Sequence, residues 1–503
     1  MPRLSHLKYY RLLEMIPAAL VWGTLLGSVV LSFARPLWAI YIIILFDLYW
    51  LIKAIYWLIY LFYSYRRYRK DIGIDWFALL KSEDPVSRDN AASHWQDIRH
   101  LIFLPTYKEP YEVLQTTFEG LAKSNYSLQN FFITIGVEER DKENGLDVAQ
   151  RIKNEYGHLF GRLWITVHPK DLPNEQPGKG SNDVWAAKQA QKEIDKMGVP
   201  YERIIVSAFD VDTIVHPQYF AHLTYKFLTH PTPHRTSYQP VAFFNNNIWQ
   251  SNAITRTISN GTTFWLLTDL SRPDRLFTFS SHSMSWKTLV AIGFWEPDLV
   301  TEDSRIFLQC FIYFNGDYTV TPMYVPVSMD TVETGTFWGS LKALYRQQRR
   351  WAWGIEHFPY MVWHFWHNKK IGFMKKFKYF FNLTEGMYSW ATAPLVILIL
   401  GRLPLWFADR TTQTTVIAQN APVVLDWLLT TAMIGLLATA VLSVVFLPPC
   451  PPGESKHKYL YMLLQWVVFP YTMIIFGSIP AIEAQTRLAT GNYLDFTVTK
   501  KRR

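Results

Sequence analysis

Two carboxylates separated by one residue, Asp210 and Asp212, directly follow the apolar run of residues 204–209. A short apolar run of this kind is typical of a buried strand. Ligands of open α/β sheets bind beyond the carboxyl ends of the strands, and hard divalent cations take oxygen ligands while sharing substrate phosphates. The pair therefore predicts a metal site, with an acidic turn after the strand as the plainer alternative.

A second polar stretch, residues 105–110, follows the apolar run of residues 101–104. A loop at this place can approach a nucleotide base with its backbone while Tyr107 packs on the base, with Thr106 and Glu109 beside it. A turn bounded by two prolines explains the same residues without any ligand.

A third stretch, residues 177–182, has glycines on both sides of Lys179 and precedes a predicted helix. The lysine ammonium is a point charge suited to phosphate, although the spacing is not that of a Walker A loop. A helix start capped by Ser181 or Asn182 is an equally good local interpretation.

Glu302 and Asp303 open the predicted helix of residues 304–312. The helix dipole favours acidic residues at such a place without any further role. A carboxylate there can also act as general base for an incoming hydroxyl, a role typically worth about 10²–10⁴-fold in rate. Both interpretations stay open on local grounds.

The most specific stretch is Gln347-Gln-Arg-Arg350-Trp351. Gln347 and Arg350 are three residues apart, so a helix places them on one face. The Arg350 guanidinium offers a planar fork for phosphate, and the Trp351 indole offers a flat surface for a sugar. A solvated basic helix would explain the arginines but not the dense aromatic surroundings.

These residues belong to a chain of 503 residues, which is long enough for one large domain with additional elements. Its two cysteines, Cys310 and Cys450, provide neither a disulfide framework nor a zinc pattern. A net charge of +9 could suggest nucleic acid, but the basic residues cluster beside apolar segments, as in the cytoplasmic flanks of membrane helices. We therefore expect no nucleic-acid partner.

Apolar stretches near both ends of the chain predict membrane spans at residues 15–33, 37–63, 387–405 and 423–447. Basic residues precede the first span and follow the second, which predicts a cytoplasmic N-terminus and a cytoplasmic central domain in a multi-pass protein of the plasma membrane. Residues 459–482 are broken by Pro470 and Pro480, and we expect a re-entrant or interfacial segment there. Asp47 and Lys53 in the second span either mark a function or form a pair buried against neighbouring helices.

The central region alternates short apolar strands with helices, which is typical of a mainly parallel α/β sheet. The predicted strands are residues 101–104, 131–137, 163–167 and 204–209, and the predicted helices are residues 111–122, 146–156, 184–196 and 218–227. The expected organisation is two N-terminal spans (1–70), a connector (71–98), an α/β domain (99–328), aromatic and basic interfacial helices (329–378), spanning or interfacial helices (379–485) and a basic tail (486–503).

In chain order, Asp-x-Asp after a strand, Thr-Glu-Asp, Gln-x-x-Arg-Trp and membrane spans together resemble the processive family 2 glycosyltransferases, to which cellulose, chitin and hyaluronan synthases belong. The resemblance covers residues 101 to the C-terminus, and the ordered set is far more specific than any one motif. It implies a GT-A (Rossmann-like) domain that takes a sugar from a nucleotide-sugar, a UDP-sugar, with Mg²⁺ or Mn²⁺ as cofactor.

Carried over residue by residue, the resemblance implies that Asp210 faces the nucleotide-sugar and that Asp212 binds the metal, with Asp210 nearby. Asp303 would be the catalytic base, with Glu302 beside it. A single displacement would invert the anomeric centre.

The same resemblance implies that Gln347, Arg350 and Trp351 hold the pyrophosphate and the acceptor sugar at the mouth of the site. Lys179 would add positive charge where the diphosphate leaves. The tail fits the Phe-x-Val-Thr-x-Lys gating loop of cellulose synthases, which contacts the nucleotide diphosphate, with these residues: Phe496, Val498, Thr499 and Lys501.

Two stretches depart from the family pattern. Glu138 and Glu139 stand where an Asp-Asp pair is usual, and the longer side chain is expected to alter the uridine contact. Residues 279–286, which include His282, lack the usual Gly-rich, Arg-containing form. The identity of the transferred sugar therefore does not carry over.

The predicted function is elongation of a polysaccharide on a glycan acceptor at the bilayer. The alternative is transfer of a single sugar to a glycolipid or other lipid-linked acceptor. With four or five spans one chain need not enclose a channel, whereas a homodimer could. A transporter is disfavoured because the helices show no paired halves with corresponding breaks.

Overall fold

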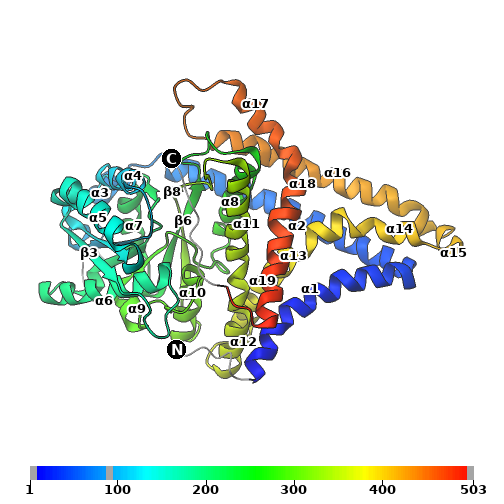
Figure 1. The fold of residues 1–503 in the computed structure, drawn as a ribbon, viewed down its shortest axis with the longest axis horizontal. Helices are drawn as coiled ribbons and strands as arrows, with labels where there is room; N and C mark the ends of the chain where they lie inside the picture. The colour runs from blue at the N-terminus through cyan, green and yellow to red at the C-terminus, as the bar shows by residue number, and fades with distance from the viewer. Residues whose placement is uncertain (1–7, 86–93, 495–503) are drawn as a thin grey trace.

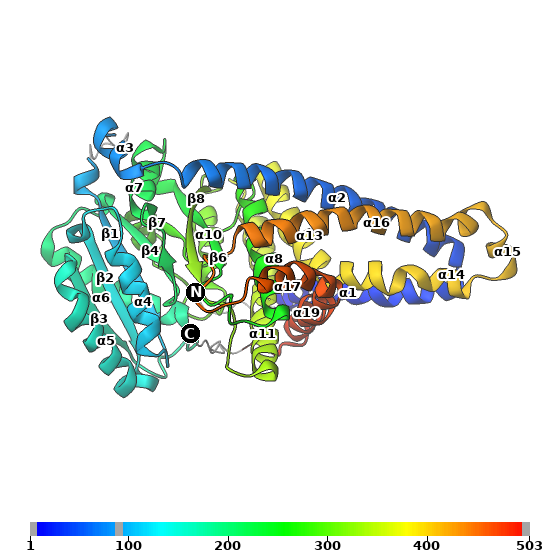
Figure 2. The same cartoon turned by 90° about the horizontal axis from the view of Figure 1, so that it is seen from above.

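The computed structural model describes residues 8–85 and 94–494. An eight-stranded sheet with its helices forms one end of the molecule. Long helices extend away from it toward the other end (Figure 1, Figure 2), namely α1 (Lys8–Ala34), α2 (Pro36–Asp71), α13 (Phe373–Leu398) and α16 (Val416–Val445). Helices α8 (Ala253–Leu270), α11 (Phe337–Ala352) and α12 (His357–His367) lie between the two ends.

One half of the sheet is parallel. Its strands are adjacent in the order β3 (Arg162–His168), β2 (Phe131–Glu138), β1 (Arg99–Thr106) and β4 (Ile204–Ala208). β2 is buried along its whole length, as expected for a parallel strand covered on both faces. The helices that follow these strands are α4 (Tyr111–Ala122), α5 (Lys142–Tyr156), α6 (Lys179–Met197) and α7 (Tyr219–Thr229).

The other half of the sheet is mixed. β7 (Ser283–Ser285) pairs antiparallel with both β4 and β6 (Thr236–Phe244), β8 (Thr319–Met329) runs parallel to β6, and β5 (Ile214–Val215) runs antiparallel to β8. Helices α9 (Trp286–Ala291) and α10 (Glu302–Tyr313) precede β8. The α/β fold class is confirmed, but the sequence analysis missed this half, because β6, β7 and β8 carry Ser, Thr and Pro instead of an apolar run.

The four predicted strands are present as β1 to β4, with ends within two residues of those expected. The start of α6 was predicted wrongly. It begins at Lys179 after Gly178, so neither Ser181 nor Asn182 caps it. Ser181 instead donates a hydrogen bond back to the Gln176 carbonyl at 2.8 Å.

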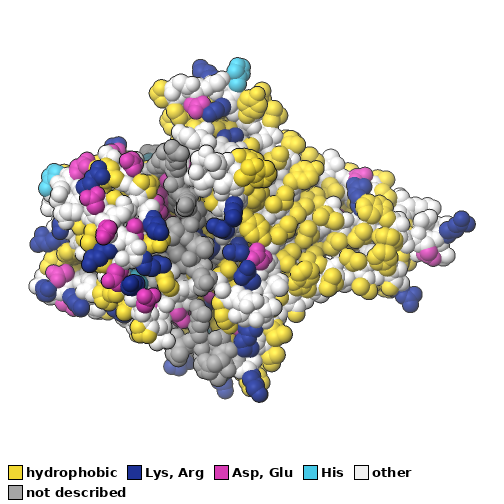
Figure 3. Space-filling view, in the orientation of Figure 1, with side chains coloured by type: hydrophobic (Ala, Val, Ile, Leu, Met, Phe, Trp, Pro, Cys, Tyr) yellow, Lys and Arg dark blue, Asp and Glu magenta, His cyan; other side chains and the backbone are white. Residues whose placement is uncertain are grey.

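Four helical segments of the described chain are long and apolar enough to cross a membrane, or five if one bent pair counts as a span. The predicted spans 15–33 and 37–63 lie within α1 and α2, and most of 423–447 lies within α16. The predicted span 387–405 is broken, because α13 and α14 (Leu403–Phe407) meet at a bend of 48°. Apolar side chains dominate the surface of this half in Figure 3, whereas charged side chains gather on the sheet half.

The segment His457–Thr490 is also apolar enough for a span. It consists of α17 (His457–Leu464), two short turns around α18 (Phe469–Thr472) and α19 (Ile479–Thr490), and it runs across the direction of α16 (Figure 1). α19 packs on α1 and α11. Its placement as a re-entrant or interfacial segment stays a prediction.

Candidate active site

Three elements far apart in sequence meet at one lysine. Asp210 follows β4, Asp303 lies in the first turn of α10, and Lys179 opens α6. The Lys179 ammonium lies 2.9 Å from Asp210 Oδ1, and 2.9 and 3.0 Å from the two carboxylate oxygens of Asp303. The structure therefore brings together the lysine, the strand-end carboxylate and the carboxylate predicted as base.

Gly180 makes this arrangement possible. A Cβ at this position would lie 3.1 Å from both Cβ and Cγ of Glu302, tighter than ordinary van der Waals contact. The missing side chain lets the start of α6 approach the start of α10. Gly180, which could give a phosphate-binding loop its flexibility, is thus also needed for the close packing of α6 against α10.

The electrostatics of this cluster follow from burial and charge. Burial alone would lower the pKa of Lys179, but the carboxylates of Asp210 and Asp303 outweigh it and raise that pKa well above its ordinary value. Burial and the Asp303 charge raise the pKa of Glu302 to about 8. Lys179 is therefore a firmly held cation, and Glu302 is mostly protonated at neutral pH.

Asp183 is a member of the cluster that the sequence analysis missed. It lies one turn after Lys179 on α6, is 1% exposed, and neither of its carboxylate oxygens has a hydrogen-bond partner among the described residues. Burial raises its pKa well above the usual range. The spacing of four residues from Lys179 was the available signal.

Asp212 is fully buried and linked to the end of β8. Its Oδ2 accepts a hydrogen bond from the Asp330 amide at 2.8 Å. Asn246 donates to the Asp212 carbonyl at 3.1 Å and to Asp330 Oδ1 at 2.9 Å. Asp330 and Asn246 were not singled out in the sequence, although each follows a strand of the sheet.

The potential metal-ligand atoms at this site fit a divalent cation only in part. Among the described residues no group of three or more His, Cys, Asp or Glu side chains could hold a metal by itself. Asp210 and Asp212 do present the hard oxygen atoms that Mg²⁺ and Mn²⁺ accept, and such ions are often held by one or two carboxylates together with substrate phosphates. The site thus suits a cation that shares its ligands with a diphosphate.

Glu138, at the end of β2, is surrounded by donors from the protein. It accepts hydrogen bonds from Asn182 at 2.9 Å and Arg140 at 3.0 Å, and His168 Nδ1 lies 3.2 Å away. His168 also contacts Glu175 at 2.9 Å. Burial alone would lower the pKa of His168, but the hydrogen bonds to the two glutamates outweigh it and raise that pKa. Glu138 therefore acts within a charge network instead of standing alone.

The loop after β1 contacts the same network. Thr106 is buried at the strand end, and the Arg140 guanidinium lies 4.7 Å from the centre of the Tyr107 ring. Glu109, two residues further along, is half-buried. The residues after β1 and β2 thus form one edge of the site.

On α11, Gln347 is buried while Arg350 and Trp351 are half-buried, and the Trp351 ring lies 5.7 Å from that of Phe244 at the end of β6. The Arg350 charge acts on Glu302. Of this motif, Arg350 is therefore the residue whose charge reaches the first turn of α10.

Glu356 lies in the short turn of residues 353–356 that follows α11, contacts the start of α10, and was missed in the sequence. It accepts hydrogen bonds from the Thr301 hydroxyl and, at 2.9 Å, from the Trp353 indole. A buried arginine, Arg305, pairs with Glu296 at 2.9 Å and donates to His357 at 3.1 Å. These contacts fix the position of α10 relative to the helices beyond it.

The residues predicted as a gating loop, Phe496, Val498, Thr499 and Lys501, lie outside the described residues. The segment leading to them is described as far as Leu494. The Leu494 carbonyl accepts a hydrogen bond from Gln176 at 2.7 Å, three residues before Lys179. The described part of the chain therefore ends near the start of α6.

The stretch that departs from the family pattern lines the other side of the cluster. The Ser280 hydroxyl donates to Asp210 Oδ2 at 2.8 Å, and His282 Nδ1 lies 3.9 Å from Asp303 Oδ1. Burial lowers the pKa of His282, so the ring is neutral at neutral pH.

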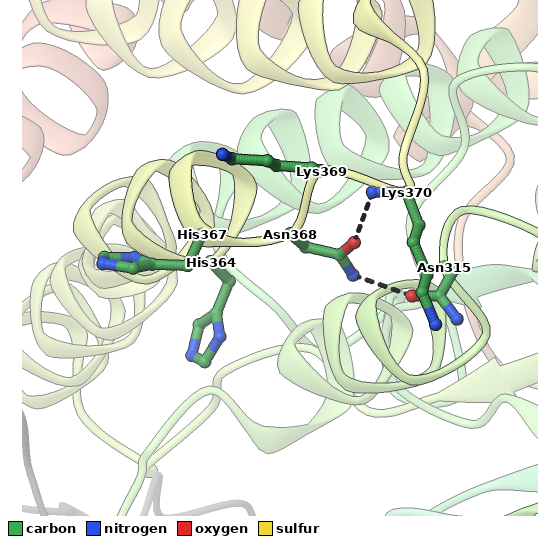
Figure 4. Close-up of a pocket in the computed structure, with 6 residues that line it drawn as sticks. All are labelled: Asn315, His364, His367, Asn368, Lys369 and Lys370. Atoms are coloured by element: carbon green, nitrogen blue, oxygen red, sulfur yellow. Dashed lines mark hydrogen bonds between the residues drawn. The ribbon is translucent and has the colours of Figure 1, made fainter.

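A shallow pocket lies elsewhere, between the end of α12 and the turn after α10, and is lined by Asn315, His364, His367, Asn368, Lys369 and Lys370 (Figure 4). Asn368 donates to Asn315 at 3.1 Å and accepts from the Lys370 amide at 3.0 Å. Asn315 lies two residues past the end of α10, and the helix runs about 15 Å from Asp303 to that end at 1.5 Å per residue. The pocket is therefore separate from the carboxylate cluster.

A comparison with known protein families shows the family of this chain. A family model described as glycosyl transferase family group 2 matches residues 205–478, more than half of the chain. The fold is similar to the mannosyltransferase PcManGT from Pyrobaculum calidifontis in complex with GDP-Man and Mn²⁺ (14% identity, 90% of this chain and 98% of that one, TM-score 0.42). It is also similar to S. aureus TarS 1-349 in complex with UDP-GlcNAc (11% identity, 78% and 92%, TM-score 0.36). No match is found among curated protein sequences.

Proposed function

Because the chain belongs to glycosyl transferase family group 2 and is a glycosyltransferase, we propose that it is a membrane-embedded, inverting enzyme that moves a sugar from a UDP-sugar onto a growing polysaccharide. The observation that carries the proposal is the bridge made by Lys179 between Asp210 and Asp303. It joins the carboxylate assigned to the donor to the one assigned as base.

In this proposal Asp303 takes the proton from an acceptor hydroxyl. The hydroxyl oxygen attacks the anomeric carbon from the face opposite the diphosphate, the bond between that carbon and the diphosphate oxygen breaks, and the nucleoside diphosphate leaves. One displacement inverts the centre, so an α-linked donor gives a β-linkage. Glu302, mostly protonated at neutral pH, is assigned to support Asp303 and not to act as a second base.

Lys179 has two tasks in this scheme. Its ammonium contacts both carboxylate oxygens of Asp303, so these oxygens are engaged by the lysine. The diphosphate of a donor competes for that ammonium, which releases Asp303 to accept a proton and places positive charge where negative charge develops. The base is thereby activated when the donor is present.

Asp212, with Asp210 nearby, would hold a Mg²⁺ or Mn²⁺ ion together with the diphosphate. Such an ion, when bound, neutralises charge on the leaving group. Asp212 is oriented for this by the Asp330 amide, and Asp210 by Ser280.

Gln347, Arg350 and Trp351 are assigned to the pyrophosphate and the acceptor sugar, which is supported by the effect of the Arg350 charge on Glu302 in the first turn of α10. The nucleotide base of the sugar donor is assigned to the edge of the site formed by these residues: Thr106, Tyr107, Glu109 and Glu138. Phe496, Val498, Thr499 and Lys501 are assigned to the diphosphate, which is supported by the contact of Gln176 with Leu494, the last described residue before them.

We place the catalytic domain on the cytoplasmic side of the plasma membrane, where nucleotide-sugars are available. Basic residues at the sheet-side ends of α1 and α2 support this orientation, such as Arg66 and Arg67. The alternative acceptor is a lipid or lipid-linked molecule that receives one sugar, and the helices beside the site suit either.

The test uses detergent-purified protein incubated with a panel of nucleotide-sugars and Mg²⁺ or Mn²⁺. Released nucleoside diphosphate and the size of radiolabelled product are measured together. Release with a high-molecular-weight ladder supports polysaccharide synthesis and identifies the donor. Release with a single lipid-extractable product supports the alternative. Equal turnover by the parent and Asp303→Asn would refute the mechanism.

A further inference from the structure

Basic side chains away from the transfer site meet where α2, α13 and the turn after α8 come together. Arg272 and Arg275 belong to that turn, which is closed by a hydrogen bond of 3.1 Å from the Arg275 amide to the Arg272 carbonyl. Lys53 comes from α2 and Lys378 from α13. These four residues form the basic cluster.

Arg272 is the buried member of the basic cluster. It is 5% exposed, and its guanidinium contacts the Asp269 carboxylate and lies 5.5 and 5.9 Å from the ring centres of Tyr56 and Tyr60. Its Nε and Nη1 have no hydrogen-bond acceptor among the described residues. Buried donors without acceptors cost free energy, so an acceptor that reaches them would bind favourably.

Arg275 is the partly exposed member, and no carboxylate pairs with it within the described part of the chain. Asn382 of α13 donates a hydrogen bond of 3.1 Å to the Arg275 carbonyl. The other two cations are paired, Lys53 with Glu385 and Lys378 with Asp274, the latter at 2.9 Å. Four cations thus face three carboxylates, and one positive charge is left over. Lys53 pairs across the helices with Glu385, not with Asp47 of its own span.

The basic cluster lies at a definite depth if α1 and α2 span the membrane, as proposed. The two helices meet at Arg35, and the hydrocarbon core takes about 20 residues of each. Counting about 20 residues onward from Arg35, α2 leaves the hydrocarbon core near Ile55. Tyr56 follows directly, and Lys53 is within one turn, where long side chains reach the headgroups.

Aromatic side chains frame the basic cluster, as at the interface level of a bilayer. The Lys53 ammonium lies 4.6 Å from the ring centre of Trp50 and 5.1 Å from that of Trp57. Tyr56 is 37% and Phe377 50% exposed. A ligand here would have its charged group at the arginines and its apolar part along these rings.

We propose that Arg272 and Arg275, with Lys53 and Lys378, bind the phosphate of an anionic phospholipid in the leaflet that faces the catalytic domain. A phosphate diester supplies the acceptor oxygens that the Arg272 and Arg275 guanidinium groups lack, and basic pockets between membrane helices are a common way to hold such headgroups. The lipid would link α2 and α13 to the turn after α8. The inference rests on the proposed membrane placement, but not on any sugar-transfer step.

The experiment is native mass spectrometry of the detergent-purified chain, titrated with phosphatidylglycerol or phosphatidylcholine. The parent should prefer phosphatidylglycerol. In the double variant Arg272→Gln/Arg275→Gln its affinity should fall roughly tenfold or more, while that for phosphatidylcholine stays unchanged. The matched control is Arg402→Gln, because Arg402 pairs with Asp426 at 2.5 Å on an exposed surface near the opposite end of α13. That variant should bind like the parent.

Equal affinity of parent and double variant for phosphatidylglycerol would overturn the proposal. Displacement of bound phosphatidylglycerol by inorganic phosphate at matched concentration would also overturn the proposal, because it would indicate a site for free anions. Should the double variant not fold, Arg275→Gln alone, at the exposed edge, must still lower the affinity. Because no nucleotide-sugar is used, a lipid preference without sugar transfer would contradict only the proposed function.

Discussion

The two halves of the sheet treat their carboxylates in opposite ways. At the end of the parallel half, the single carboxylate of Glu138 has three partners, Asn182, Arg140 and His168. At the junction with the mixed half, the Lys179 ammonium alone is shared by Asp210 and Asp303, with Glu302 and Asp183 buried close by. In the first region one carboxylate is compensated by three donors, whereas in the second two aspartate carboxylates share a single ammonium.

This difference indicates what each region can do. A carboxylate already satisfied by three donors is a fixed part of a binding surface, since breaking such a network costs free energy. Two aspartate carboxylates that share one ammonium attract a divalent cation and respond to an incoming diphosphate. We therefore expect changes in the parallel half to alter donor affinity, and changes at the junction to alter turnover.

The largest effect is expected for Asp303→Asn, which keeps the shape but removes the base. Turnover should fall by about 10²–10⁴-fold, the usual contribution of a general base, with little change in the KM for the donor. The measurement is nucleoside diphosphate release by purified protein. Asp317→Asn is the control, because Asp317 is an exposed carboxylate just past the other end of α10 that pairs with Arg235. Parent-like turnover of Asp303→Asn would mean that the junction is not catalytic.

Lys179→Met should have the next largest effect, because it removes the positive charge shared by the two carboxylates. We expect kcat to fall about 10²–10³-fold, as when one group that stabilises developing charge is removed. Lys196→Met, on the exposed part of the same helix, should be neutral. A variant that lost only donor affinity would place Lys179 functionally with the parallel half, and the expected link between the junction and turnover would be wrong.

Removal of divalent cations with EDTA should stop diphosphate release by the parent, and added Mg²⁺ or Mn²⁺ should restore it. Asp212→Asn keeps an acceptor for the Asp330 amide but lowers the charge, so it should require more metal for half-maximal rate. The readout is the metal concentration dependence of release. Full activity in EDTA would show that the crowded carboxylates need no cation.

Glu138→Gln should raise the donor KM by roughly tenfold, the loss expected from one charge-assisted hydrogen-bond group, with kcat nearly unchanged. The measurement is a donor titration at saturating acceptor. Glu193→Gln, on the exposed face of α6, is the matched control. A large fall in kcat instead would mean that both halves of the sheet contribute to the chemical step.

The smallest effect concerns stability and Glu302. Its pKa in the folded protein is about 8 against an ordinary value of 4.5, so the folded state keeps a proton that the unfolded state releases. The free energy of unfolding should therefore fall as pH rises from about 4.5 to 8. Glu302→Gln should flatten this part of the profile, as measured by thermal unfolding in detergent across that range. An unchanged slope would assign the pH dependence to other groups.

Much of the parallel half could be predicted from the sequence. Residues 131–137 form an apolar run and are found as β2, and residues 111–122 show helical spacing and are α4. Such patterns are local, so a short window contains them. The mixed half escaped because β6 contains Pro240 and polar residues, and β7 is only three residues long. Those strands are stabilised by their partners in the sheet and not by an apolar sequence of their own.

The types and order of the chemical groups follow from the sequence alone. They are the carboxylates after β4, the acidic start of α10 and the Gln-x-x-Arg-Trp helix, in a chain with apolar segments near both termini. These are local features of composition and spacing. Other features come from the packing: Lys179 pairs with a carboxylate 124 residues away, Gly180 must lack a side chain, and Glu356, which follows α11, contacts the start of α10. Such contacts depend on how packed elements approach one another, which no window of sequence contains.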